Sequence, residues 1–493
     1  MRKLLTTLLL TLPFIITRAQ NIDTIVEHAA HSFMKKGSRM GLSLGVISKG
    51  KTYQYHFGTT QKGIISKPNE KTIYEIGSIT KTFTSLLLAQ AVEDKKVNLN
   101  DDIRKYLKGS YDNLQYQGKP IRLIHLANLT SGLPNNLPEK LPAFKTKDPD
   151  SQLFEYKKIH DAYTREMFLA DLHQVKLTTE PGLKGGHSNT AAELMGFLLE
   201  NIYGESYPAL LKKFITGPLQ MSGTFVSLPV SLQPITAIGY NDKGVVMPDV
   251  PEDAGSGGAI RSSLEDMIKY MTYQLKEKDS KVILSHQTTW GDDQSNAVGL
   301  NWRTKTNFDG KRKIWASGGT FGFSSYGVLY PERDFAVIAL TNESDNAAQD
   351  ALDQIAQTIY NELYFSAAER SSAGFGYSAP INTLLVKLNQ RGFNQAIPVV
   401  QELLKSNPKL KYSEGEINSF GYRLLGKGQR DKALEVFKLN VYLFPKSSNT
   451  YDSLAETYES MGDKALAIKN YSMAVELDPS NTNSAEHLKK LKN

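Results

Sequence analysis

A serine followed three residues later by a lysine is the feature of this chain that points most directly to chemistry. Ser78 and Lys81 lie where an apolar segment, residues 73–76, runs through a glycine into a helical pattern of apolar residues. Residues three apart share one face of a helix, so the Lys81 amine is expected beside the Ser78 hydroxyl. A helix amino terminus also offers free backbone N–H groups and positive potential to a developing anion. The spacing therefore predicts a nucleophilic serine with a lysine as its base.

The Ser-x-x-Lys spacing is weak when it stands alone. It also occurs at Ser32, Ser48 and Ser406, where no neighbouring pattern supports catalysis. The plainer interpretation is that Ser78 caps a helix and that Lys81 is a solvated charge. The choice between the two depends on whether the rest of the chain supplies the other parts of a catalytic site.

A second polar segment is suited to lowering the pKa of the lysine. A lysine with the ordinary pKa of about 10.4 is neutral, and able to accept a proton, in roughly one molecule in 2500 at pH 7. Burial and neighbouring hydrogen-bonding groups lower such a pKa. The turn-rich loop 181–189 leads into a helical pattern and ends in His187, Ser188 and Asn189. We expect this triplet to face the serine.

A third segment consists of small residues at the end of a predicted strand. Ala316 is followed by Ser317, Gly318 and Gly319. Such small residues let a substrate lie against the strand edge. The backbone N–H of Gly319, together with that of Ser78, is expected to form an oxyanion hole. Ser317 and Gly318 are expected to line the substrate site.

The three segments fall in the order and spacing of the motifs of penicillin-recognising serine hydrolases. The motifs are Ser78-Ile79-Thr80-Lys81, His187-Ser188-Asn189 and Ala316-Ser317-Gly318. Over residues 22–365 the chain resembles the class C β-lactamase group, with its D-alanyl-D-alanine peptidases and related esterases. Residues 129–134, 254–258 and 322–325 resemble that group as well. The resemblance implies an acyl-enzyme on Ser78, with Asn189 holding Lys81 and the carbonyl side of the substrate.

Two positions depart from the family pattern. The second motif usually begins with tyrosine and here begins with His187, while the third usually begins with lysine or histidine and here begins with Ala316. An imidazole with an ordinary pKa of about 6.5 is about three-quarters neutral at pH 7. We therefore expect His187, with Lys81, to take the Ser78 proton; a histidine that only forms hydrogen bonds is the alternative. The missing cation at Ala316 favours an esterase, because some esterase members of the family also lack that charge.

The expected elements form one mostly antiparallel sheet flanked by helices. The strands are expected at 41–47, 52–58, 313–316, 324–330 and 335–341. The helices are expected at 22–36, 121–128, 190–203, 207–215, 264–274 and 346–365. This order predicts an α/β sandwich, and the resemblance implies that it is of the β-lactamase/D,D-peptidase type, over residues 20–365.

The C-terminal part of the chain has a period of its own. Residues 366–379 have linker composition, and beyond them residue types recur at a spacing of 34. The recurring pairs are Gly428 and Gly462, Ala433 and Ala467, Phe437 and Tyr471, and Pro445 and Pro479. This period is typical of tetratricopeptide repeats and predicts an all-α repeat domain over residues 380–493, with an unrelated helical bundle as the alternative. Such arrays bind peptides or partner proteins, or act as spacers.

The N-terminus has the pattern of a secretory signal. Arg2 and Lys3 precede an apolar run, residues 4–16, and cleavage is expected after Ala19. Residues 1–19 therefore predict a secreted or periplasmic protein of the bacterial envelope, without a stable membrane span in the mature chain; an uncleaved anchor is the alternative. The 493 residues include no cysteine, which excludes disulfides and thiolate metal sites. The formal charge of +7 gives no support to nucleic-acid binding, and no metal or organic cofactor is expected.

These features predict an exported serine hydrolase that cleaves a β-lactam, a D-amino-acid peptide or a small ester. The repeats would be available to a protein or peptide partner. Two alternatives stay open. One is a carboxylesterase with little β-lactamase activity, and the other is a non-catalytic binding or sensor protein that uses the repeats for protein interaction.

Overall fold

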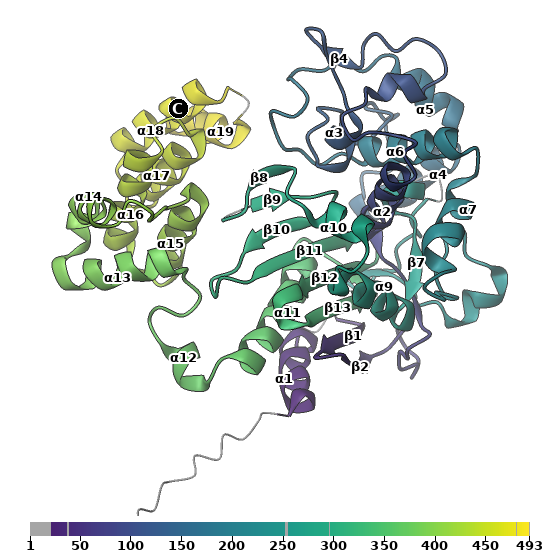
Figure 1. The fold of residues 1–493 in the computed structure, drawn as a ribbon, viewed down its shortest axis with the longest axis horizontal. Helices are drawn as coiled ribbons and strands as arrows, with labels where there is room; N and C mark the ends of the chain where they lie inside the picture. Colours follow the sequence, from purple (N-terminus) through teal and green to yellow (C-terminus); the bar gives the residue numbers. More distant parts are fainter. Residues whose placement is uncertain (1–20, 37–38, 252–254, 295, 480, 493) are drawn as a thin grey trace, which may run out of the picture.

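The computed structural model describes residues 21–36, 39–251, 255–294, 296–479 and 481–492 (Figure 1). The expected signal peptide, residues 1–19, lies outside the described residues. Two parts follow one another along the chain, a sheet with helices on both faces and then an array of helices (Figure 1). None of the helices in the described ranges is both long and apolar enough to cross a membrane.

An antiparallel sheet of eight strands organises the first part. The strand order is β2-β1-β13-β12-β11-β10-β9-β8, and neighbouring strands are antiparallel throughout. The strands are β1 (Gly41–Ser48), β2 (Lys51–Gly58), β8 (Trp290–Asp292), β9 (Asn296–Val298), β10 (Arg303–Thr306), β11 (Arg312–Gly319), β12 (Ser324–Tyr330) and β13 (Phe335–Thr341). The five strands that the sequence predicts are present, β11 is longer than expected, and the sequence patterns did not indicate β8, β9 or β10.

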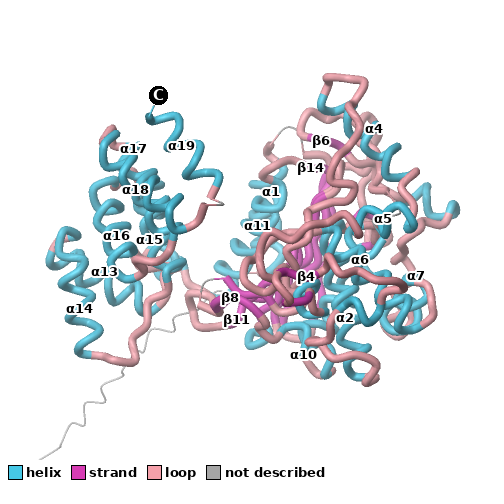
Figure 2. Tube along the Cα trace, turned by 90° about the horizontal axis from the view of Figure 1, so that it is seen from above, coloured by secondary structure: helices cyan, strands magenta, loops and turns pink. Residues whose placement is uncertain are grey.

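Alternating side chains give the sheet two faces, each covered by helices. Leu44 of β1 packs in one apolar cluster with α1 (Ile22–Met34) and α11 (Ala348–Tyr364). The next residue, Gly45, faces α9 (Leu264–Lys276), and a Cβ there would lie 2.6 Å from a side chain of that helix. The predicted sandwich of helices around one antiparallel sheet is confirmed (Figures 1 and 2).

Further helices and short strands surround the region of Ser78. The helices are α2 (Thr80–Glu93), α3 (Leu123–Ala127), α4 (Pro149–Asp161), α5 (Arg165–Leu172), α6 (Asn189–Tyr203), α7 (Tyr207–Leu211), α8 (Gly255–Gly258) and α10 (Ser280–His286). The short strands are β3 (Ile73–Glu75), β4 (Gln115–Tyr116), β5 (Lys119–Pro120), β6 (Tyr240–Asn241), β7 (Arg261–Ser263) and β14 (Glu343–Ser344). The sequence predicts α3, α6, α7 and α9 to within a few residues, and it gave no sign of α4 or α5.

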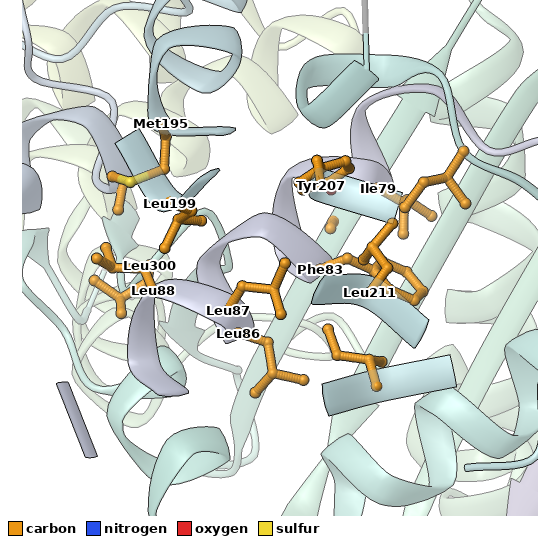
Figure 3. Close-up of a cluster of buried hydrophobic side chains, with 14 of the residues drawn as sticks. Ile79, Phe83, Leu86, Leu87, Leu88, Met195, Leu199, Tyr207, Leu211 and Leu300 are labelled. Carbon is orange, nitrogen blue, oxygen red and sulfur yellow. The ribbon is translucent and has the colours of Figure 1, made fainter. Parts of the chain in front are cut away.

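The helix that follows Ser78 is enclosed nearly all round. Of the 14 residues of α2, 11 are buried, among them Leu88 and Phe83. The Phe83 ring stacks on Tyr270 of α9 with 3.9 Å between the ring centroids. Figure 3 shows Leu88 in the same apolar cluster as Leu199 of α6. A helix that is buried on nearly all sides is a core element, so α2 is a rigid support for the residues at its amino terminus.

The C-terminal part is all α-helical, as expected. The helices are α12 (Ala367–Ser371), α13 (Ala379–Arg391), α14 (Ala396–Ser406), α15 (Glu414–Gly426), α16 (Arg430–Leu443), α17 (Ser448–Ser460), α18 (Lys464–Leu477) and α19 (Thr482–Lys492). The pair α17 and α18 begins 34 residues after the pair α15 and α16. Gly428 and Gly462 make the equivalent turns, with φ of +71° and +84°. The two hairpins thus share length and turn geometry, and their identity as tetratricopeptide repeats stays a prediction.

The predicted linker, residues 366–379, has local structure of its own. It contains α12, and the ring of Phe375 packs against Phe308 and Phe365, with centroid distances of 5.0 and 5.2 Å. These contacts attach the segment to the sheet part of the chain. Composition alone had indicated a linker, and that role stays a prediction.

Candidate active site

Ser78 lies in a tight turn between a strand and the enclosed helix. β3 leads into a 3-10 turn, Gly77–Ile79, and α2 begins at the next residue. Gly77 has a φ of +50°, a conformation that favours glycine. Ile76 and Ile79 are fully buried on either side of the serine. The serine therefore occupies the turn before α2 rather than the first turn of the helix itself.

The Lys81 amine lies directly beside the serine hydroxyl. Its Nζ is 2.9 Å from Ser78 Oγ, 2.8 Å from Asn189 Oδ1 and 2.7 Å from the carbonyl oxygen of Gly257 in α8. The side chain is 4% exposed. The structure thus brings together Ser78, Lys81 and Asn189 from three segments far apart in the sequence.

Burial makes Lys81 a stronger candidate for a base than an ordinary lysine. Burial lowers its pKa to about 8, and the nearby Glu193 carboxylate acts in the opposite direction. At that pKa about one molecule in ten carries a neutral amine at pH 7. The fraction able to accept the Ser78 proton is therefore about 200 times larger than for a solvated lysine.

The second motif is held in place by the helix that it begins and by the neighbouring loop at residues 134–136. The Ser188 hydroxyl caps α6, accepting from the backbone N–H of Ala191 at 3.0 Å, and donates to the carbonyl of Pro134 at 2.7 Å. The Asn189 amide donates to Asn136 Oδ1 at 2.8 Å, which leaves its own Oδ1 turned to the Lys81 amine. Ser188 is thus occupied in the cap, while Asn189 orients the lysine.

His187 lines the same cavity and differs from its expected state. Its Nδ1 lies 2.7 Å from Asn135 Oδ1, so that Nδ1–H donates and Nε2 keeps its lone pair. Burial, followed by the charges of Lys81 and Arg303, lowers its pKa to about 4. An ordinary pKa near 6.5 was expected from the sequence; the pKa is lower because the fold buries the ring and brings two cations near it. Among the described contacts, the ring makes no hydrogen bond to Ser78.

The third motif meets the serine turn at very short range. A Cβ at Gly318 would lie 2.1 Å from the carbonyl oxygen of Ile76 and 2.9 Å from the backbone nitrogen of Ser78. A Cβ at Gly77 would likewise lie 2.7 Å from the nitrogen of Gly319. The Ser325 hydroxyl donates to the Ile76 carbonyl at 2.8 Å and joins β12 to the same turn. Only glycine fits at positions 77 and 318, and this places the N–H groups of Ser78 and Gly319 near each other.

The edge of β11 is open toward the cavity at the third motif. Residues 316–319 pair with β12, whereas β10 pairs only with residues 312–315. A cavity of about 680 Å³ lies at this edge. Its lining includes Ser78, Lys81, His187, Asn189, Ala316, Ser317 and Gly319, and Gly318 lies directly behind it. All the candidate residues that the sequence singled out therefore gather around one space.

Arg303 is a cavity residue that the sequence patterns did not indicate. It is the first residue of β10 and faces the cavity at the point where pairing with β11 stops. Burial lowers the pKa of its guanidinium, and it has no ion-pair partner within the described part of the chain. The alternation of buried Trp302 and Thr304 with Arg303 was the available signal for a strand here. A cation thus lies in the same cavity as Ala316, the position at which the family pattern usually has a lysine or a histidine.

An aromatic wall closes another side of the cavity. Tyr156 and His160 extend from α4, and the Tyr156 ring meets Phe321 edge to face at a centroid distance of 5.8 Å. The Tyr156 and His160 rings stack at 4.2 Å. Helix α4 has no fully buried residue, which explains why its sequence shows little helical periodicity. This wall adds apolar contact area for a substrate.

Comparison with known proteins points in the same direction as the geometry. A model of the beta-lactamase family matches residues 26–361, which ends before α12. Protein flp of Staphylococcus aureus (strain MRSA252) is 26% identical over 360 residues, covering 70% of this chain and 67% of that protein. A beta-lactamase of Yersinia enterocolitica is 24% identical over 365 residues, covering 66% of this chain and 87% of that protein.

A solved structure shares the fold of the first part. It is a beta-lactamase/D-alanine carboxypeptidase from Yersinia pestis, complexed with citrate, with a TM-score of 0.59 and 26% sequence identity. The match covers 69% of this chain and 98% of that chain. Nearly the whole of that protein is therefore represented in this one, which carries additional chain.

Proposed function

Because this chain belongs to the beta-lactamase family, we propose that it is an exported serine hydrolase that cleaves an amide or an ester through an acyl-enzyme on Ser78. The observation that carries the proposal is the contact of 2.9 Å between Ser78 Oγ and the Nζ of Lys81, a buried amine whose pKa is lowered to about 8. A serine hydroxyl is a weak nucleophile until a neighbouring base accepts its proton. Here the base is adjacent and partly neutral at physiological pH.

Acylation follows from these positions. The neutral Lys81 amine accepts the Ser78 proton as Oγ attacks the carbonyl carbon of the substrate. The backbone N–H groups of Ser78 and Gly319 donate to the oxyanion that forms. When the tetrahedral intermediate collapses, the bond to the leaving nitrogen or oxygen breaks, and the Lys81 ammonium returns the proton to that atom.

Deacylation uses the same groups with a water molecule as the nucleophile. His187 Nε2, kept free by the bond between Nδ1–H and Asn135, accepts a hydrogen bond from the water and orients it. The water oxygen bonds to the acyl carbon, the bond to Ser78 Oγ breaks, and the water proton passes through Lys81 to Oγ. We therefore assign the proton-accepting role to Lys81, whereas the sequence argument shared it with His187.

Arg303 favours substrates that carry a carboxylate. A guanidinium binds a carboxylate through paired hydrogen bonds, and a partly desolvated one gains more from doing so than one in water. Penicillin-like compounds and peptides that end in a D-amino acid both carry such a group beside the scissile bond. Among the admissible substrates we therefore place β-lactams and D-amino-acid peptides first.

A carboxylesterase with little β-lactamase activity is the second candidate, and Ala316 is the observation that favours it. In this candidate the aromatic wall of Tyr156, His160 and Phe321 supplies the binding energy, and Arg303 contributes little. A simple ester without a carboxylate would then be the better substrate. The two candidates differ in one measurable quantity, the preference for a carboxylate-bearing substrate.

Further parts of the proposal rest on the sequence. Export to the bacterial envelope rests on residues 1–19, and assignment to the class C branch rests on the spacing of the three motifs. Binding of a protein or peptide partner rests on the repeat of 34 residues. If Ser78 does not react with substrates, the remaining candidate is a non-catalytic binding protein.

Turnover of two chromogenic substrates tests the proposed function. Purified protein is offered a cephalosporin, which carries a carboxylate, and a nitrophenyl ester, which does not. We expect hydrolysis of both and none by Ser78→Ala. Arg303→Gln should raise KM for the cephalosporin by about tenfold or more and leave the ester unchanged, because a charge-assisted hydrogen bond contributes roughly 1.5–3 kcal/mol.

The outcomes separate the candidates. Hydrolysis of the ester alone, with no effect of Arg303→Gln, supports the carboxylesterase. If neither the parent protein nor Ser78→Ala turns over either substrate, the non-catalytic binding protein is the remaining candidate.

A further inference from the structure

A second and larger cavity separates the sheet edge from the C-terminal helices. Its volume is about 1200 Å³. One side is formed by β8, β10, β11 and α11, and the other by residues 375–378 and α15. Figure 1 shows β8 and β9 on the side of the sheet that faces the helical array. Known small-molecule pockets occupy about 300–1000 Å³, so this space accommodates a larger ligand.

The lining of this interdomain cavity is aromatic and polar. Its aromatic members are Trp290, Phe308, Tyr330, Tyr360, Phe375 and Tyr377. Amide and hydroxyl side chains, including Asn307, Gln357, Asn418 and Ser419, lie between them. Such side chains both donate and accept, as the backbone of a peptide requires. The lining therefore suits the backbone of an extended peptide.

Two cations face the cavity from opposite parts of the chain. Lys305 of β10 is partly buried, and within the described ranges its ammonium has neither a hydrogen bond nor an ion pair; its ring contact is with Trp315, 5.9 Å away. Arg423 of α15 lies over the Tyr377 ring at 4.7 Å. By contrast, Lys313 is paired with Asp353 at 2.8 Å.

The charges around Lys305 leave room for an anion. Burial, followed by Lys313 and Arg423, lowers the pKa of Lys305, while Asp353 and Glu416 act in the opposite direction. At this ammonium the repulsion from Lys313 and Arg423 is therefore only partly offset by the two carboxylates. The lining as a whole carries as many carboxylates, Asp292, Glu414 and Glu416, as cations, so the positive excess is local to Lys305. A carboxylate between Lys305 and Arg423 would reduce the repulsion between the two cations. Its hydrogen bonds would also replace the water contacts that the Lys305 ammonium loses on burial.

We propose that the interdomain cavity binds a carboxylate-bearing peptide whose acidic group bridges Lys305 and Arg423. The acidic residues Glu414 and Glu416 at the start of α15 lie on the same cavity and suit the amino end of such a ligand. Binding would therefore require both parts of the chain. The proposal does not depend on the hydrolase activity.

The interdomain cavity adjoins the catalytic one. Arg303 and Lys305 lie on the same face of β10, about 6.6 Å apart at 3.3 Å per residue, and line one cavity each. The Trp290 ring lies against Gly185, where a Cβ would be 2.7 Å away, and Gly185 precedes His187 by two residues. A ligand in the interdomain cavity would thus lie against Trp290, the side chain that contacts the loop of His187.

Binding of a defined peptide to full-length Ser78→Ala protein tests the proposal. The probe is the tripeptide Glu-Glu-Glu, followed by tryptophan fluorescence and by calorimetry. We expect saturable binding that weakens at least tenfold in Lys305→Gln and in Arg423→Gln. Lys427→Gln, at an exposed residue directly after the end of α15, is the matched control and should bind as the parent does.

Two comparison ligands and a folding control complete the experiment. The amidated tripeptide Gln-Gln-Gln and inorganic phosphate should bind at least tenfold more weakly than Glu-Glu-Glu. An unchanged melting temperature shows that each variant is folded. Absence of binding to the parent protein, equal binding of Gln-Gln-Gln or phosphate, or full binding by both cavity variants would overturn the proposal. Use of the Ser78→Ala protein keeps these outcomes separate from the fate of the proposed catalysis.

Discussion

At the residue scale, Lys81 decides whether Ser78 reacts at neutral pH. The sequence predicts that the two side chains are adjacent, because residues three apart share a helix face. It could not predict how far the pKa of Lys81 falls, since the groups that bury the amine come from distant segments, among them Gly257 of α8. Contact between residues close in the sequence can be predicted from the sequence. The pKa of a residue that distant segments bury cannot.

The pH dependence of acylation follows from the state of Lys81. The neutral amine is the competent form and its pKa is about 8, so kcat/KM should rise about tenfold per pH unit up to pH 8 and then level. His187, with its pKa lowered to about 4, stays neutral across this range. A pH profile of ester hydrolysis between pH 5 and 10 measures this directly.

His187→Gln is the matched variant for the pH profile. It should slow turnover and leave the midpoint of the rise near pH 8. A midpoint near 6.5 that disappears in His187→Gln would instead show that the histidine is the base, with an ordinary pKa, and would contradict the assignment to Lys81.

Arg303 shows a second limit of reasoning from residues. The loss of the usual cation at Ala316 was visible in the sequence, but its replacement by a cation on another strand was not. Arg303 enters the cavity only because β10 ends its pairing with β11 at that residue. The register of β10 against β11 therefore determines that the Arg303 side chain faces the cavity, and the sequence did not predict this register.

At the scale of elements, the site depends on how closely β11 approaches the turn before α2. Strands β12 and β13 were predicted to the residue, because β13 is a run of apolar and β-branched residues and a clear turn, residues 331–334, separates it from β12. Strands β8, β9 and β10 have three or four residues each and carry polar side chains. They are too short to show clearly the alternation of apolar and polar residues that predicts a strand. Helix α4 has no fully buried residue and hence little periodicity.

Gly318→Ala tests the close approach of these two elements. The new methyl group would lie 2.1 Å from the Ile76 carbonyl oxygen, so the turn or the strand must move. We expect a loss of about 1–3 kcal/mol in the free energy of unfolding. Displacing the N–H groups of Ser78 and Gly319 should also lower kcat by a factor on the order of 100–1000, as removal of one oxyanion donor does.

Gly426→Ala serves as the control for the glycine substitution. A Cβ at Gly426 has no neighbour within 4 Å, and the residue ends helix α15. Chemical denaturation and ester turnover should both be unchanged or slightly improved. Parent-like activity in Gly318→Ala would show that the strand and the turn are not in the contact described.

At the scale of the whole molecule, the chain has separate apolar cores. The sheet part has one core on each face, and α13 to α17 enclose another around Phe437 and Phe420. The sequence predicts a division of the chain from the linker composition of residues 366–379 and the period of 34 residues that follows it, and the exact domain bounds stay a prediction. The orientation of α15 toward the sheet edge could not be predicted, since no local sequence pattern determines how two parts of a chain pack.

Phe437→Ala tests whether the two parts are independent. Its ring is fully buried and lies against Gly421, so its removal should cost the helical array about 3–5 kcal/mol. Thermal unfolding followed by circular dichroism should show a helical transition at lower temperature, while small-ester turnover is unchanged. Tyr442→Ala, whose ring is 46% exposed on the same helix, is the control and should have little effect. Loss of turnover in Phe437→Ala would mean that the array supports the catalytic part.

Covalent labelling of Ser78 tests the central claim most directly. Full-length protein and Ser78→Ala are each incubated with a fluorophosphonate probe and, separately, with a labelled penicillin, and intact mass is measured. We predict a single adduct from the fluorophosphonate, and one from the penicillin if Arg303 serves carboxylate-bearing substrates, with neither in Ser78→Ala. No adduct from either reagent, or an adduct that persists in Ser78→Ala, would contradict an acyl-enzyme on this serine.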